Sequence, residues 1–308
     1  MSTAVQSAPT PFSPTDSQIA VAYAVCRGIT RKAAKNFYYA FLILPRPKRR
    51  ALCAVYAFMR RCDDIADDES LPTHERRQRL AEWLGSVHRA FAGYPTDEPV
   101  LLALTHAQRR FGIPAGLLDE LAFGTAMDVE EGQAESASRV AYATFEDLKL
   151  YCHRVASVVG LVCIRIFGYT EPEAEPLAER CGLAFQLTNI IRDIKEDALA
   201  GRVYLPGEDL AEFSISPDEL ADATDAARYA PLLAMEAERA REFYQSGDDL
   251  IPYVNEDSQP ALWVLINIYR ALLDKIASRN YDVFHGKVSL SVREKLAILG
   301  KGFWQRLL

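Results

Sequence analysis

From Ser17 onward, apolar residues recur at spacings of three and four along nearly the whole chain. That spacing is the period of an α-helix that buries one face, whereas the period-two alternation typical of strands is scarce. Prolines and glycines interrupt the pattern, as expected where helices end. We therefore expect an all-α bundle. The predicted helices cover residues 18–43, 48–68, 73–92, 98–111, 115–131, 144–168, 173–198, 216–248, 257–280 and 291–305.

The chain is expected to form one domain with a short tail. Its 308 residues are 49% hydrophobic and contain no repeat, low-complexity tract or linker, which suits one large helical core. Residues 1–18 contain Pro9, Pro11 and Pro14 and lack the basic and apolar regions of a signal peptide, so they predict a flexible tail. The domain then covers residues 19–308.

Local signals refine two helix starts and one loop. Thr144 followed by Asp147 is typical of a capping box, and Ser216-Pro217 places a capping residue before a first-turn proline. The polar sequence EGQAESASRVA, which begins at Glu131, predicts a loop that is able to serve as a lid.

Charge, cysteine spacing and hydropathy exclude several functions. Aspartate and glutamate number 42 against 35 lysines and arginines, a net charge of -7, so no diffuse positive field exists to hold a nucleic acid. The six cysteines form no CxxC pair, which predicts reduced thiols and a cytoplasmic protein. In the most apolar stretch, Arg154 and Arg165 are separated by ten residues, half of the ~20 that a spanning helix needs, so we expect no transmembrane segment.

An acidic stripe follows the helix predicted over residues 48–68. Asp63 and Asp67 are four residues apart and share a helical face, which Tyr56 and Arg60 extend. Like charges at this spacing destabilise a helix by roughly 0.2 to 0.5 kcal/mol, so carboxylates among apolar neighbours need a compensating cation. A solvated helix end is the alternative interpretation.

A second polar stripe lies in QLTNIIRDIKED. Gln186, Asn189, Asp193 and Asp197 fall on one helical face, and the three isoleucines of this segment fall elsewhere. Two helices thus carry matching polar stripes within apolar sequence.

Oxygen ligands without histidine or cysteine suit a hard cation, and Mg²⁺ is typically held by one or two carboxylates together with substrate phosphates. A di-iron site would use Glu-x-x-His pairs, and no histidine accompanies either stripe. The stripes therefore indicate a diphosphate substrate. Phosphate also needs basic side chains, and the candidates are Lys35, Arg60, Arg192, Lys287 and Lys295.

From residue 28 to residue 296 the chain resembles the squalene/phytoene synthase family, the head-to-head prenyltransferases. The resemblance rests on the motifs NFYYAFLILPRPKRRAL, YAFMRRCDDIAD, YCHRVASVVG, QLTNIIRDIKED with GRVYLP after it, and NIYRALLDKI. It implies the all-α isoprenoid-synthase fold with a central active-site cavity. It departs from the family in the diphosphate loop, where members often carry serines and this chain has Ala34 and Asn36.

The resemblance also implies roles for individual residues. Two or three Mg²⁺ ions would be bound by Asp63, Asp67, Asn189, Asp193 and Asp197. Substrate would be contacted by Lys35, Asn36, Tyr56, Arg60, Gln186, Arg192, Tyr269, Lys287 and Lys295. The catalytic residues would be Tyr56, Arg60, Tyr151 and Tyr204, with the reaction proton taken by a tyrosine or by the leaving diphosphate. Ala156, Ser157 and Gly160 leave room for an isoprenoid chain or serve close helix packing.

The implied reaction joins two farnesyl diphosphates to presqualene diphosphate, and on to squalene if a second step follows, because CDDIADD and the segment from Tyr151 resemble the bacterial hopanoid-pathway enzymes most. Phytoene synthase, acting on two geranylgeranyl diphosphates, is the alternative, and a catalytically silent scaffold is a further one. No G-x-G-x-x-G motif is present, so use of NADPH stays open. The C-terminal KGFWQRLL has the composition of an interfacial helix, so we expect a cytoplasmic enzyme with peripheral contact at the inner membrane surface, and downstream isoprenoid enzymes as possible partners.

Overall fold

The computed structural model describes residues 13–34, 37–68, 70–131 and 142–305. Within these residues the chain is helical and contains no strand, only an isolated bridge between Tyr169 and Val254, so the all-α prediction is confirmed. The α-helices of the N-terminal half are α1 Asp16–Ala33, α2 Phe37–Phe41, α3 Arg46–Ala66, α4 Thr73–Phe91, α5 Pro99–Phe111 and α6 Ala115–Glu131. Those of the C-terminal half are α7 Phe145–Cys152, α8 Val158–Phe167, α9 Ala174–Leu199, α10 Gly207–Glu212, α11 Ala226–Leu250, α12 Gln259–Ser278 and α13 Val292–Gln305.

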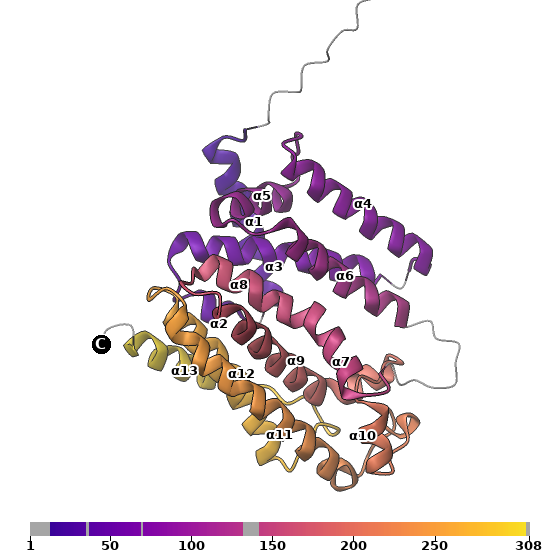
Figure 1. The fold of residues 1–308 in the computed structure, drawn as a ribbon. Coiled ribbons are helices and arrows are strands. Elements are labelled where there is room, and N and C mark those ends of the chain that lie inside the picture. The colour runs from indigo at the N-terminus through magenta and orange to yellow at the C-terminus, as the bar shows by residue number, and fades with distance from the viewer. Residues whose placement is uncertain (1–12, 35–36, 69, 132–141, 306–308) are drawn as a thin grey trace, which may run out of the picture.

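Two groups of helices pack on each other (Figure 1). In the N-terminal group, α3 packs on α1 and α5; in the C-terminal group, α9 lies centrally, against α8, α11 and α12. Helix α8 also contacts α3 and α6, so it joins the two groups. The buried apolar side chains of both groups form one continuous core.

Short-range chemistry fixes several helix ends. Thr15 and Gln18 form a capping box at the start of α1, and the predicted box of Thr144 and Asp147 begins α7. Gly168 ends α8 with φ +74°, a conformation that a residue with a Cβ adopts only under strain.

Four sequence-based helix assignments differ from the structure. The helix predicted over residues 18–43 is two helices, since α1 ends at Ala33 and α2 begins at Phe37. Helix α1 begins at Asp16, so residues 16–18 at the end of the predicted tail are helical. The other three errors lie in the C-terminal half. The helix predicted over residues 144–168 contains a π-helical turn, His153–Ser157 (η1).

The helix predicted to start at Ser216 starts ten residues later. Pro217–Glu219 forms only a 3₁₀ turn, and Ser216 makes no side-chain capping bond. Helix α11 begins at Ala226, where the Asp225 carboxylate accepts from the Ala227 amide at 3.1 Å. Helix α10 was missed, since six residues are too few to show a helical period.

One helical segment among the described residues, Phe145–Phe167, is long and apolar enough to cross a membrane. Core helices meet the same criterion. Here the segment packs on α9 and α6, and Val158, Val162 and Ile166 are buried in the core, so packing accounts for its composition. The six cysteines are all free, as predicted, and five are buried.

Candidate active site

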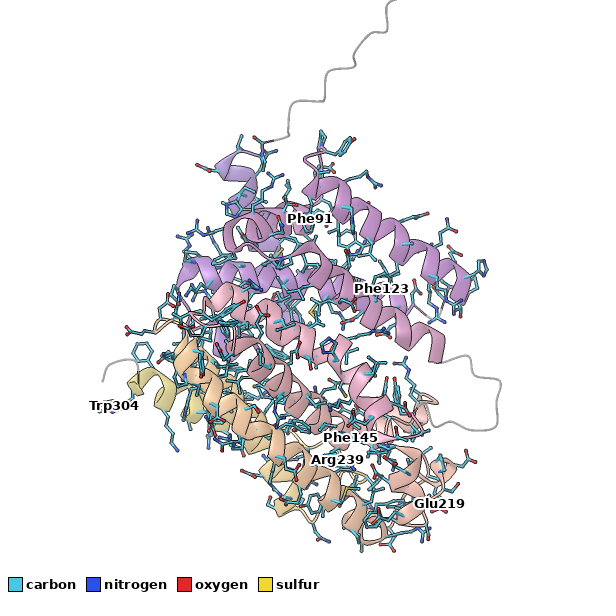
Figure 2. The ribbon with its side chains drawn as sticks, in the orientation of Figure 1. Phe91, Phe123, Phe145, Glu219, Arg239 and Trp304 are labelled. Atoms are coloured by element: carbon cyan, nitrogen blue, oxygen red, sulfur yellow. The ribbon has the colours of Figure 1, made fainter. Side chains whose placement is uncertain are left out.

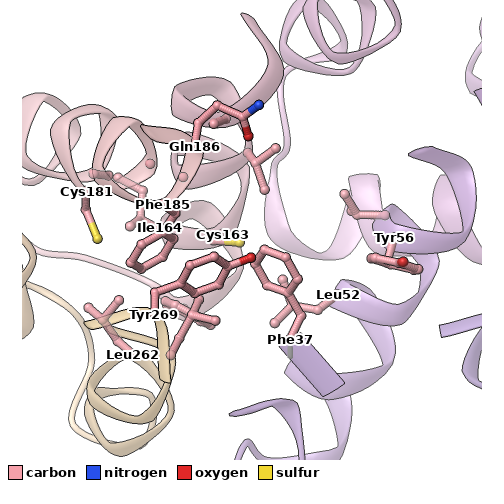
Figure 3. Close-up of a pocket in the computed structure, with 18 of the residues that line it drawn as sticks. Phe37, Leu52, Tyr56, Cys163, Ile164, Cys181, Phe185, Gln186, Leu262 and Tyr269 are labelled. Atoms are coloured by element: carbon pink, nitrogen blue, oxygen red, sulfur yellow. The ribbon is translucent and has the colours of Figure 1, made fainter. Parts of the chain in front are cut away.

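A cavity of about 180 Å³ lies between α2 and α3 on one side and α8, α9 and α12 on the other (Figure 3). Its walls are almost entirely apolar, and its polar lining residues are Tyr56, Gln186, Asn189 and Tyr269. Two of these precede the predicted acidic ligands by one to two turns: Asn189 comes four residues before Asp193, and Tyr56 seven before Asp63. Two of the polar lining residues therefore lie on the helices that bear the stripes, one to two turns before the acidic residues.

Two glycines bring the helices behind the cavity into direct contact. A Cβ at Gly160 on α8 would lie 2.5 Å from the carbonyl oxygen of Ala178, and one at Gly182 on α9 would lie 2.5 Å from that of Ala156. The Ser157 hydroxyl donates to the Glu179 carbonyl at 2.8 Å. Close packing thus explains the small residues, while Ala156, Gly160 and Gly182 also line the cavity.

Tyr269 and Tyr56 lie on opposite walls. Tyr269 is buried, stacks on Phe185 with ring centroids 4.4 Å apart, and points its hydroxyl toward Phe37 (Figure 3). Burial, reinforced by the negative charge of Asp63, raises the pKa of Tyr56 to about 12. Tyr56 is therefore a neutral phenol at the apolar end of its acidic stripe.

Asp193 is the most strongly paired residue of the second stripe. Its carboxylate accepts two hydrogen bonds from Arg192, one at 2.8 Å from Nε, and lies 3.2 Å from Lys287 Nζ, which also pairs with Glu196. Burial raises the pKa of Asp193, but the hydrogen bonds and charges of Arg192 and Lys287 outweigh it and hold the pKa below its usual range. The structure thus brings three predicted residues together, although Lys287 comes from the distant loop before α13.

In the first stripe, Arg60 has a carboxylate partner one residue away from the predicted ligand Asp63. Arg60 Nη2 lies 2.6 Å from Asp64 Oδ1, and Asp64 is not among the predicted site residues. Asp63 is half-buried, whereas the Asp67 side chain is exposed and lies 3.8 Å from Arg202, which follows α9. Arg202, in the GRVYLP motif, therefore connects the ends of the two stripes.

The donor set of the two stripes fits a hard divalent cation. It consists of carboxylates and amide oxygens, and Asn189 Oδ1 is buried without a hydrogen-bond partner. Within the described residues no three aspartate, glutamate, histidine or cysteine side chains yet converge as a ligand cluster. Arg192 and Lys287 occupy the coordinating oxygens of Asp193 in this conformation, as a metal would.

Several predicted residues lie elsewhere. Tyr151 and Tyr204 are not among the cavity-lining residues; they stack at 5.2 Å and form a cluster with Tyr142. Lys295 is buried, with Nζ 5.7 Å from the ring centroid of Tyr39. Asp197 is half-buried on the α9 stripe, one turn beyond Asp193. Lys35, Asn36 and residues 132–141 of the predicted lid lie outside the described residues.

Comparisons with known proteins agree with this geometry. The squalene/phytoene synthase family profile matches residues 30–294. The chain belongs to the squalene/phytoene synthase family. It is 34% identical over 303 residues to a phytoene synthase of Arthrospira platensis, covering 94% of this chain and 93% of that one, and 36% identical over 286 residues to a phytoene synthase of Mycobacterium bovis, covering 92% and 90%.

Solved structures of the family share the fold. A dehydrosqualene synthase in complex with ligand superposes with a TM-score of 0.82 at 28% identity, covering 94% of this chain and 98% of that one. Squalene synthase HpnC from Alicyclobacillus acidocaldarius gives 0.75 at 29% identity, covering 87% and 97%. The chain therefore has the isoprenoid-synthase helical fold of a head-to-head prenyltransferase family that uses divalent metal.

Proposed function

We propose that this enzyme condenses two geranylgeranyl diphosphates head to head to form phytoene. The observation that carries the proposal is the apolar cavity that ends at two oxygen-rich stripes, since this arrangement suits a long hydrocarbon with a diphosphate head. The C20 substrate is favoured because curated relatives at 34% and 36% identity are phytoene synthases. Condensation of two farnesyl diphosphates, which the sequence motifs favour, is the second candidate and is supported by the two superposed structures.

Ionisation of the substrate requires basic side chains that bind the diphosphate and acidic side chains that bind the metal. Arg192 and Lys287, with Arg60 on α3, would hold the diphosphate through charge-assisted hydrogen bonds. Asp63, Asp67, Asn189, Asp193 and Asp197 would hold Mg²⁺, which when bound neutralises the negative charge that develops on the departing diphosphate. The apolar walls exclude water, which would otherwise quench the allylic cation.

The carbon chemistry then proceeds in the cavity. The C1–O bond of one substrate breaks, and its electron pair leaves with the diphosphate. The C2–C3 double bond of the second substrate attacks C1, and loss of a proton closes a cyclopropane. A second ionisation, rearrangement and proton loss give phytoene without a reductant.

Tyr56 is the best placed of the three tyrosines considered as proton acceptors, because it lines the cavity and Tyr151 and Tyr204 do not. Since its phenol is neutral, it can take a proton only while it passes its own onward, and the leaving diphosphate is the natural acceptor. Tyr269 and the stacked Phe185 present aromatic rings that stabilise a nearby cation.

The test is incubation of the purified protein with Mg²⁺ and either farnesyl or geranylgeranyl diphosphate, with and without NADPH, followed by mass analysis of the products. We expect phytoene from the C20 substrate without NADPH. Asp63→Ala and Asp193→Ala should each abolish diphosphate release. The control Asp119→Ala should not, because Asp119 on α6 pairs at the surface with His88 of α4. Products only from the C15 substrate would support the second candidate, and no product from a folded protein would support the scaffold.

We also propose that the enzyme contacts membranes peripherally, as a cytoplasmic protein at the inner membrane surface. Phe303 and Trp304 near the end of α13 are 51% and 65% exposed, and Lys301 on the same helix is also exposed. Trp304 lies at the outer edge of the molecule (Figure 2). Aromatic and basic side chains on one exposed helix end suit an anionic lipid surface. Co-sedimentation with phosphatidylglycerol vesicles should fall for Phe303→Ser combined with Trp304→Ser; equal co-sedimentation of variant and wild type would contradict this contact.

A further inference from the structure

The loop between α12 and α13 carries Lys287 to the second acidic stripe. Lys287 is 50% exposed at its side chain and reaches two carboxylates of α9, with its Nζ 3.2 Å from Asp193 Oδ1 and a second pair with Glu196. The loop has no regular secondary structure that would hold this lysine in place. Its position therefore depends on these two ion pairs and on contacts made elsewhere in the loop.

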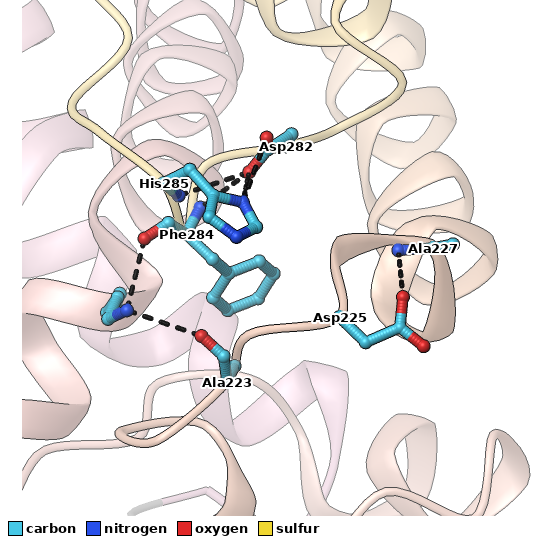
Figure 4. Close-up of polar contacts among 7 residues, drawn as sticks. Ala223, Asp225, Ala227, Asp282, Phe284 and His285 are labelled. Carbon is cyan, nitrogen blue, oxygen red and sulfur yellow. Dashed lines mark hydrogen bonds and ion pairs between the residues drawn. The ribbon is translucent and has the colours of Figure 1, made fainter.

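The loop is anchored to α9 by Lys195, which lies within the motif QLTNIIRDIKED but is not among the predicted site residues. Lys195 Nζ donates to the carbonyl oxygen of Phe284 at 3.1 Å and to that of Ala223 at 3.3 Å. Figure 4 shows Phe284 and Ala223 with a dashed line at each of these carbonyl oxygens. Ala223 lies just before α11. One ammonium group thus ties the α12–α13 loop and the segment before α11 to the helix that bears Asp193.

The part of the loop that Lys195 bonds, around Phe284, is also held by packing and by local hydrogen bonds. The Phe284 ring is buried against Tyr229 of α11, with centroids 4.8 Å apart. Asp282 Oδ1 accepts from the backbone amides of Phe284 and His285, at 3.2 and 3.1 Å, and faces the His285 ring at 3.0 Å. These contacts hold Asp282, Phe284 and His285 together just before Gly286 and Lys287, so Lys195 bonds a preformed turn.

We propose that Lys195 is a positioning residue for the substrate diphosphate: by holding the Phe284 carbonyl, it places Lys287 beside Asp193, from which Lys287 transfers to the diphosphate. This inference rests on the proposed function, because it assigns the diphosphate as the anion that Lys287 meets. Lys195 itself touches neither Asp193 nor the cavity. Its effect on binding passes through Lys287.

The experiment is a double-mutant cycle of Lys195→Met and Lys287→Ala, read as binding of inorganic pyrophosphate with Mg²⁺ by calorimetry. Each single variant should weaken binding about tenfold, the size expected for one charge-assisted hydrogen bond. The double variant should bind no more weakly than Lys287→Ala alone, because the two changes remove one interaction. Lys195→Arg should restore much of the affinity, since a guanidinium can also donate to two carbonyls.

Lys275→Met is the matched control, because Lys275 joins α12 to Glu294 of α13 at 2.9 Å without holding the loop to α9. It should leave pyrophosphate affinity unchanged. Steady-state assays should give Lys195→Met a raised KM with little change in kcat. The proposal would be overturned if the losses in pyrophosphate affinity of the two single variants were additive in the double variant. It would also be overturned if Lys195→Met bound pyrophosphate as tightly as the wild type, or if the wild type did not bind pyrophosphate. The product assay on the wild type tests the proposed function separately.

Discussion

Glu236 on α11 is a buried carboxyl group whose ionisation we expect to weaken one end of the bundle. Its side chain is 1% exposed, and Arg239 donates to its Oε2 at 3.0 Å. The same guanidinium donates to both oxygens of Asp209 on α10, at 2.6 and 3.2 Å, and lies 4.2 Å from the ring centroid of Phe145 at the start of α7 (Figure 2). Two carboxyl groups therefore share one cation where α7, α10 and α11 meet.

The size of the effect follows from the pKa of Glu236. Burial, opposed by the charge of Arg239 and reinforced by Asp209, raises the pKa of Glu236 from 4.5 to about 8. Its Oε1 is buried without a partner, which suits a carboxyl group that keeps its proton. The stabilising contribution of the neutral form is fully present below pH 4.5 and is lost as the pH rises toward about 8. In that window each pH unit lowers the free energy of unfolding by roughly 1.4 kcal/mol.

The assay compares wild type with Glu236→Gln, which keeps the shape of the neutral acid and cannot ionise. Between pH 5.5 and 7.5 the wild type should lose about 3 kcal/mol relative to the variant, which shifts the difference between their melting temperatures by about 5 °C. Thermal unfolding followed by circular dichroism measures this difference, and other titrating groups cancel because they are common to both proteins. A melting-temperature difference that is the same at both pH values would refute the reasoning.

Two further predictions concern packing and thiols. Gly182→Ala should lower the free energy of unfolding by about 1 to 3 kcal/mol, because its Cβ would meet backbone, whereas Gly28→Ala in α1, with open space around it, should be neutral or stabilising in the same chemical denaturation assay. Burial raises the pKa of the Cys26 and Cys62 thiols to about 12, so a thiol-specific reagent at pH 8 should label them only after unfolding. Cys163 is similarly shifted but lines the cavity, so mass analysis should find it labelled first; rapid labelling of Cys26 in the folded protein would contradict the burial argument.

The sequence allowed the helical fold to be predicted because burial leaves a periodic trace. Ile190, Ile191 and Ile194 are all buried, as their positions opposite the polar stripe of α9 require. Helix α10 and the break after Ala33 left no such trace. Both are decided by tertiary packing over a few residues, which is too short a length for a period to appear.

Sequence spacing groups candidate site residues that share one helix, but it does not connect residues that come from different elements. Spacing placed Asn189 and Asp193 on one face of a helix, and both lie on α9, with Asn189 lining the cavity. Spacing alone did not choose between Asp63 and Asp64 as the partner of Arg60, because residues three and four apart are both neighbours on a helix. No pattern connected Lys195 to the carbonyl of Phe284, because a backbone acceptor is the same at every residue.

The cations around Asp193 link metal binding to diphosphate binding. Arg192 and Lys287 neutralise the Asp193 carboxylate before any ligand arrives, so a metal ion must displace them from its oxygens. The oxygens of a diphosphate offer both cations new acceptors. Mg²⁺ and diphosphate should therefore favour each other's binding by the same factor. Calorimetric titration of Mg²⁺ with and without pyrophosphate measures that factor, and equal Mg²⁺ affinity in both titrations would show that the cations do not exchange.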